Sequence, residues 1–140
     1  RNLQKTAKII MSEYNNKFPT KKEDILALPG LGEYTVGAVM SFALNIRAPI
    51  VDTNVDRVIS RVFIPKKISN HATKTQYSKI LWLLSEALLP EAEFWEFNQG
   101  IMDFGALQCT VSKPKCNSCP FSSFCLRYQQ NSLSRFFNIK

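Results

Sequence analysis

Apolar side chains recur every three or four residues along most of this chain, the spacing that predicts amphipathic helices. In the first 16 residues the repeat consists of Leu3, Ala7, Ile10 and Tyr14. The same spacing predicts a short helix through Ile25 and Leu26, and longer ones at 33–45, 53–62, 77–88 and 94–104. No segment alternates apolar and polar residues as a strand does. The sequence therefore predicts an all-α chain with six helical segments.

Two of these segments carry more specific expectations. Segment 33–45 is apolar on nearly all sides, so we expect it to be buried on most of them. Pro65 to Asn70 is polar and lies between two apolar repeats. We therefore expect it to be a connector.

A glycine-rich turn precedes segment 33–45. Its sequence is Leu28-Pro29-Gly30-Leu31-Gly32, followed by Glu33-Tyr34-Thr35. Gly30 and Gly32 permit positive φ and a close approach of the backbone to a ligand. Because a helix begins directly after the turn, its first backbone N–H groups should face outward, where they suit an anion such as phosphate.

An acidic residue stands before the next helix, in Val51-Asp52-Thr53-Asn54. Asp52 has two interpretations: a carboxylate placed for chemistry, or an ordinary helix N-cap. Arg57 and Arg61 lie on a different helix face from the apolar residues. They are candidates for contacting phosphate, with surface solvation or a structural ion pair as the alternative.

The charge balance favours a polyanionic partner. Eighteen basic residues against 11 acidic ones give a net charge of +7 in 140 residues. A domain with solvated lysines is the alternative explanation. No apolar stretch approaches the ~18 residues of a membrane span, and no secretory leader is evident, so we expect an intracellular protein of the cytoplasm, nucleoid or nucleus.

All four cysteines fall near the C-terminus, in the pattern Cys109-x6-Cys116-x2-Cys119-x5-Cys125. Disulfides are disfavoured in a reducing compartment, so clustered thiols indicate a metal centre. The spacing alone leaves structural zinc and an iron–sulfur cluster both open. Lys113 and Lys115 lie between the first two cysteines, where a metal-fixed backbone would let them meet phosphates at little ordering cost.

These motifs, in this order, resemble those of one superfamily. The glycine turn, Val51-Asp52 and the cysteine spacing are similar to the helix-hairpin-helix DNA glycosylases, which include endonuclease III, adenine glycosylases and thymine-mismatch glycosylases. The lead-in segment 98–106 is similar as well. The resemblance runs from Arg1 to about Tyr128 and implies the C-terminal part of the family's helical barrel. It also implies a [4Fe-4S] cluster held by Cys109, Cys116, Cys119 and Cys125.

The resemblance divides the chain into three regions. Residues 1–107 would form the helical glycosylase region, 108–126 the cluster loop and 127–140 a C-terminal tail. Segments 1–16 and 73–107 are candidates for the lobe on the cluster side. Family members carry further helices before the point matching Arg1, so a companion polypeptide supplying those helices is a candidate partner.

The resemblance also assigns roles to individual residues. The implied DNA contacts are Leu28, Gly30, Leu31, Gly32, Thr35, Lys113 and Lys115. Asp52 would stabilise positive charge developing on the sugar and orient the attacking water. Tyr34 occupies the position of the lysine in lyase-competent members. Tyrosine cannot form their Schiff base, so base excision without strand cleavage is implied.

The implied function is removal of a mispaired base, thymine or uracil or adenine opposite guanine, from duplex DNA during base-excision repair. The target nucleotide would first be flipped out of the helix. The alternative is a partial, non-catalytic glycosylase that serves as an iron–sulfur DNA-binding module.

Overall fold

Helices form all the regular secondary structure in residues 1–130, which are the residues that the structure, a computed structural model, describes. The α-helices are α1 (Asn2–Glu13), α2 (Lys22–Leu26), α3 (Glu33–Ala38), α4 (Thr53–Phe63), α5 (Lys66–His71), α6 (Lys74–Leu88) and α7 (Phe94–Leu107). A π-helical turn (Val39–Ala43) extends α3, and a 3₁₀ turn (Cys116–Ser118) lies among the cysteines. The prediction of an all-α chain is confirmed.

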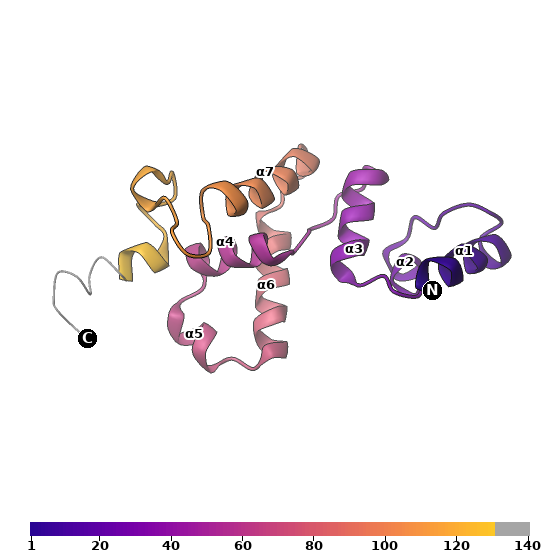
Figure 1. Cartoon of the computed structure of the whole chain (residues 1–140), viewed down its shortest axis with the longest axis horizontal. Coiled ribbons are helices and arrows are strands. Elements are labelled where there is room, and N and C mark those ends of the chain that lie inside the picture. The colour runs from indigo at the N-terminus through magenta and orange to yellow at the C-terminus, as the bar shows by residue number, and fades with distance from the viewer. Residues whose placement is uncertain (131–140) are drawn as a thin grey trace.

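The helices form two groups joined by an extended linker (Figure 1). We call residues 1–43 the hairpin lobe, 44–52 the linker and 53–130 the cysteine lobe. The hairpin lobe has its own small core, formed by Ile25, Val36 and Met40 together with Ala48 of the linker. A second core, formed by Val55, Ile59 and Leu81, holds α4 against α6. Each lobe therefore buries an apolar cluster of its own.

Helix α1 lies with the hairpin lobe, although we considered segment 1–16 a candidate for the cluster side. Thr6 is buried, and its hydroxyl donates to the Pro29 carbonyl at 3.0 Å. Asn2 packs directly over Gly30. Helices α6 and α7, by contrast, lie beside α4 (Figure 1).

The connector expected at 65–70 is largely the short helix α5, so that prediction was wrong. The helix begins at Lys66, directly after Pro65, and the Ile68 and Ser69 amides donate to the Pro65 carbonyl. None of its residues is buried. A helix without an apolar face gives no periodic signal, which is why the sequence pattern did not show it.

Segment 33–45 also differs from its expected form, because its α-helix gives way to π geometry at Val39. The Leu44 amide bonds to the Val39 carbonyl at 3.0 Å, five residues back. Val36 and Met40 are buried, but Ala43 is exposed. From 35 to 42 every residue is buried or half-buried, and within the segment only 33, 34, 43 and 45 are exposed. Burial on most sides therefore holds for the middle of the segment and not for its ends.

The last region was expected to be a tail from residue 127. Residues 126–130 are helical, and 131–140 lie outside the described residues. Among the helices described, none is both long enough and apolar enough to cross a membrane.

Candidate functional site

The glycine turn is closed by a hydrogen bond from the Leu31 amide to the Leu28 carbonyl at 3.2 Å, and Leu28 is buried beneath it. Gly30 has φ +85°, and a Cβ there would stand 2.8 Å from Cβ of Asn2. Glycine is therefore required at this position for its conformation and its small size. Gly32 has φ −95° and open space around it, so the expected positive φ is found only at Gly30.

Gly32 is the N-cap of α3, and the first turn of that helix faces solvent. Glu33 is exposed, and Tyr34 is 43% exposed. The first N–H groups of a helix have no partner within it, so an outside acceptor can meet them here. Glu33 places a negative charge beside these groups, which weakens their attraction for an anion.

Asp52 is the N-cap of α4. Its Oδ1 accepts the Asn54 amide at 2.8 Å and the Val55 amide at 2.7 Å, and its Oδ2 accepts Nδ2 of Asn54 at 2.9 Å. The capping interpretation is therefore correct as geometry. Capping does not use all of the carboxylate's hydrogen-bonding capacity, because an ionised carboxylate offers about four acceptor sites and three are used here. The carboxylate of this half-buried residue is held in one orientation and keeps acceptor capacity for a further donor, such as water.

Hydrogen bonds continue from Asp52 towards the cysteines. Asn54, whose amide nitrogen holds Asp52, accepts a bond from Arg57 on its Oδ1 at 2.8 Å. Arg57 also donates to the carbonyls of Gly105 at 2.6 Å and Cys109 at 2.8 Å. The guanidinium of Arg57 is thus occupied inside the protein and does not serve as the free phosphate ligand that we considered.

Arg61 lies one helical turn further along α4 and holds the start of the cysteine segment. It donates to the carbonyls of Thr110 at 2.7 Å and Val111 at 3.0 Å, and its Nη1 lies 3.4 Å from the Cys109 Sγ. The Cys125 thiol donates to the Arg61 carbonyl at 3.3 Å. Sequence reasoning missed this role. The only available signal was the i, i+4 spacing of the two arginines, and it does not reveal that backbone carbonyls are their targets.

The four cysteines are free, half-buried thiols around one cavity of about 270 Å³, which Arg61 also lines. Burial raises the pKa of the Cys116 thiol, the neighbouring Cys109, Cys119 and Cys125 raise this pKa further, and the Arg61 charge opposes them. In residues 1–130, no three Cys, His, Asp or Glu side chains are placed to hold a single metal ion. The four cysteines thus line one cavity, and their thiols do not converge on a single metal-ion position.

Aromatic ring contacts and a pair of hydrogen bonds between Gln108 and Lys115 fix the cysteine segment to the helices. Phe104 packs on Phe121 with ring centroids 4.9 Å apart. The Lys115 amide donates to the Gln108 carbonyl at 3.0 Å, and Nε2 of Gln108 donates to the Lys115 carbonyl at 2.8 Å. Lys113 and Lys115 are exposed on this anchored backbone. Their side chains can therefore meet a ligand while the loop stays in place.

The predicted site residues fall into two places. The turn, Tyr34 and Thr35 belong to the hairpin lobe, whereas Asp52 opens α4 next to the linker and connects through Arg57 to the cysteines. No hydrogen bond joins Tyr34 to Asp52 in the part of the chain that is described. A ligand reaching both would have to contact α3 and the start of α4 together.

Two helices joined by a glycine turn that exposes a helix N-terminus define a helix-hairpin-helix protein, and the helix-hairpin-helix motif model matches residues 13–42. The adenine DNA glycosylase of Buchnera aphidicola subsp. Schizaphis graminum is 40% identical over 96% of this chain. The thymine/uracil-DNA glycosylase of Methanothermobacter thermautotrophicus is 38% identical over 93% of it. A thermostable thymine-DNA glycosylase superposes with TM-score 0.82 at 37% identity, covering 92% of this chain and 58% of its own. The chain belongs to the helix-hairpin-helix DNA glycosylase superfamily.

A non-covalent endonuclease III–DNA complex is also similar, with TM-score 0.76 and 26% identity over 95% of this chain and 59% of that one. These matches cover nearly all of this chain but only part of each relative. This chain spans 38% of the Buchnera protein and 57% of the Methanothermobacter protein.

Proposed function

We propose that this chain is part of a monofunctional DNA glycosylase that removes a mispaired base from duplex DNA. The observation that carries the proposal is the Asp52 carboxylate, which three N–H donors orient at the start of α4 while it stays half exposed. The relatives support it, because those of 38–40% identity are named adenine or thymine/uracil DNA glycosylases. The substrate would be thymine or uracil, or adenine, in a mispair with guanine.

The chemistry follows from the placement of Asp52. Breaking the N-glycosidic bond of a flipped-out nucleotide leaves positive charge on the sugar. A fixed carboxylate stabilises that charge without having to reorganise during the reaction. The remaining acceptor site on the carboxylate can bind the attacking water and take its proton. Asp52 is thus proposed as the catalytic residue and as the cap of its helix.

Tyr34 makes the proposed enzyme monofunctional. Strand cleavage in this superfamily needs an amine that attacks the sugar and forms a Schiff base, and the phenol of Tyr34 cannot do this. Tyr34 is 43% exposed on the first turn of α3, so it can line the pocket for the flipped base.

Two surfaces are proposed to bind the DNA backbone. The glycine turn, from Leu28 to Gly32 with Thr35, presents N–H groups to one phosphate. Lys113 and Lys115, exposed on the anchored cysteine segment, would contact others. Because these contacts reach phosphates and not base edges, they position the duplex without reading its sequence.

The cofactor is proposed to be a [4Fe-4S] cluster on Cys109, Cys116, Cys119 and Cys125. The donor set fits, since four thiols surround one cavity and the charge of Arg61 lies beside Cys109 Sγ, where it offsets thiolate charge. When bound, the cluster would cross-link a loop that has little core of its own. Iron and sulfide in the purified protein would support the assignment, and one zinc per chain without iron would contradict it.

We further propose that excision needs the region that the relatives have beyond the matched part, whether this region is in the same polypeptide or in a companion. The competing function is a non-catalytic DNA-binding module. The geometry that favours this alternative is the use of Asp52 as a cap, because capping alone would account for an aspartate here.

The two functions are separated by a set of labelled duplexes carrying thymine, uracil or adenine opposite guanine, incubated with the protein in its full natural length. The proposal predicts release of one of these bases, leaving an abasic strand that stays intact until alkali is added. Binding of all duplexes with release of no base would leave the non-catalytic module as the function.

A further inference from the structure

The linker between the lobes is held in place along its length. Ala48 and Ile50 are 5% and 0% exposed, and Asp52 follows only two residues after Ile50. Whatever fixes the linker therefore also fixes where Asp52 stands relative to the hairpin lobe.

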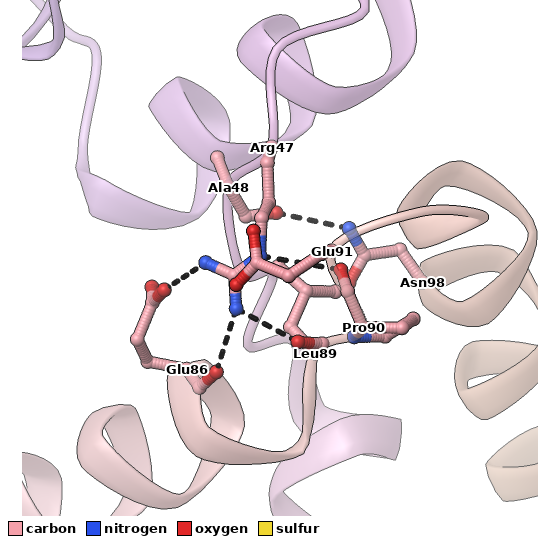
Figure 2. A network of polar contacts seen from close by, with 7 residues as sticks. All are labelled: Arg47, Ala48, Glu86, Leu89, Pro90, Glu91 and Asn98. Carbon is pink, nitrogen blue, oxygen red and sulfur yellow. Dashed lines mark hydrogen bonds and ion pairs between the residues drawn. The ribbon is translucent and has the colours of Figure 1, made fainter.

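Arg47 makes the most extensive of these contacts, which Figure 2 shows. Its Nε donates to the Pro90 carbonyl at 3.2 Å. Its Nη2 donates to the carbonyls of Leu89 at 2.7 Å and Glu86 at 3.2 Å. The Glu86 carboxylate pairs with Nη1, and the Glu91 carboxylate lies 3.5 Å from Nε. One side chain from the linker thereby binds the whole corner between α6 and α7.

The chemistry of this corner explains why arginine suits it. The last carbonyls of a helix have no partner within the helix and form the negative end of its dipole, so a cation there is favourable. Arg47 meets the Glu86 carbonyl in the last turn of α6 and the carbonyls of Leu89 and Pro90, which directly follow the helix, with donors that lie in one plane. A lysine could supply the charge, but it lacks the planar fork that bonds several acceptors at fixed angles.

Two further contacts hold the next residues of the linker. Nδ2 of Asn98, a buried side chain of α7, donates to the Ala48 carbonyl at 2.9 Å and to the Ser41 hydroxyl at 3.0 Å. A Cβ at Gly37 would stand 2.2 Å from the Pro49 carbonyl oxygen, so the linker lies directly on α3. Three consecutive linker residues are thus fixed by three different elements.

We propose that Arg47 is a positioning residue that sets the place of Asp52 relative to the glycine turn and Tyr34. This inference rests on the proposed function, because the two lobes must present these residues to the same nucleotide. The lobes also meet directly where α7 packs on the π-helical turn, through the Asn98–Ser41 hydrogen bond and the Phe42–Trp95 ring contact at 5.3 Å. Without Arg47 the linker keeps its buried apolar residues but loses its attachment to the end of α6. The contacts of α7 with Ser41, Phe42 and Ala48 then hold the lobes alone, and we expect the angle between the lobes to vary more.

The test compares Arg47→Gln, which lacks both charge and fork, with Arg47→Lys, which keeps the charge. Glu91→Gln is the matched control, because that carboxylate is 90% exposed and its loss leaves the carbonyl bonds intact. Residual dipolar couplings of backbone N–H groups report how the lobes are oriented. In the wild type and the control, one alignment tensor should fit both lobes. In Arg47→Gln, the two lobes should need different tensors, with Arg47→Lys in between.

Single-turnover excision at saturating protein, well below the unfolding temperature, is the second readout. Displacing a catalytic group by about 1 Å can cost as much as ~100-fold in rate, so we expect Arg47→Gln to fall by at least about tenfold and Glu91→Gln by less than twofold. The inference would be overturned if one alignment tensor fitted both lobes of Arg47→Gln, or if its excision rate were unchanged. If Arg47→Gln does not fold, the same two measurements on Arg47→Lys decide. The excision assay uses the protein in its full natural length. Failure of that wild type to release any base would refute the proposed function instead, while the couplings would still decide whether Arg47 fixes the lobes.

Discussion

Gly105 and Gly100 lie on the same helix, α7, and alanine at each position would meet very different surroundings. A Cβ at Gly105 would stand 2.7 Å from Cβ of Asn54 and 2.9 Å from its carbonyl oxygen. At Gly100 no atom outside the adjoining residues and the backbone of α7 lies within 4 Å of the new carbon. The pair therefore separates the close approach of α7 and α4 from the general effect of replacing glycine in a helix.

The expected magnitudes follow from these distances. Replacing a helical glycine by alanine stabilises the folded state by about 0.5–1 kcal/mol at either position. Gly105→Ala must also push Asn54 away, and overpacking of this kind costs about 1–3 kcal/mol. The two variants should thus differ by about 1–3 kcal/mol, which for a domain of this size corresponds to several degrees in Tm. Gly100→Ala should be the more stable variant.

The same displacement should reach Asp52, the proposed catalytic residue, since Asn54 holds Asp52 on one side and Arg57 on the other. Thermal unfolding followed by circular dichroism gives the stability difference, and single-turnover excision gives the functional one. Excision should fall in Gly105→Ala and stay unchanged in Gly100→Ala. Equal Tm values and equal rates for the two variants would refute the close packing of α7 on Asn54 as the support of this site.

Two further predictions concern residues that we propose lie close to bound DNA. Tyr34→Lys should introduce an amine that reaches the sugar, so this variant should be trapped covalently on DNA by borohydride, whereas the wild type should not be; trapping of the wild type would show that another lysine acts as a lyase nucleophile. Replacing Lys113 and Lys115 together by glutamate should weaken duplex binding and reduce its dependence on salt by up to about two phosphate contacts, with Lys66→Glu and Lys67→Glu on α5 as the control pair. An unchanged salt dependence, measured by fluorescence anisotropy, would exclude the cysteine segment from the interface.

The apolar pattern predicted most of this fold, because burying a helix face imposes a period that the sequence displays. It could not predict α5, which buries no residue, or the π geometry at Val39. The candidate site likewise has features that the sequence predicted and features that it did not. The spacing of Cys109 to Cys125 indicated a shared centre, and these thiols do line one cavity.

The contacts that hold this site together were not predictable in the same way. Arg47, Arg57 and Arg61 bind carbonyls at least 39 residues away in sequence, apart from local bonds within α4. A backbone carbonyl is present at every position, so its use as a partner leaves no trace in the residue pattern. The sequence indicated the charges of these arginines, and the structure was needed to identify what they bind.

The central claim is that Asp52 acts in catalysis as well as capping α4, and Asp52→Asn tests it most directly. Asparagine caps helices about as well as aspartate, so the substitution keeps the two amide bonds of the cap. It removes the negative charge and the bond that Oδ2 accepts from Nδ2 of Asn54. The measurement is single-turnover release of the mispaired base, alongside Tm and duplex affinity. We predict that release is lost, with Tm and affinity nearly unchanged, because the carboxylate stabilises charge that develops only in the transition state. Release at the wild-type rate would show that Asp52 is a helix cap and nothing more.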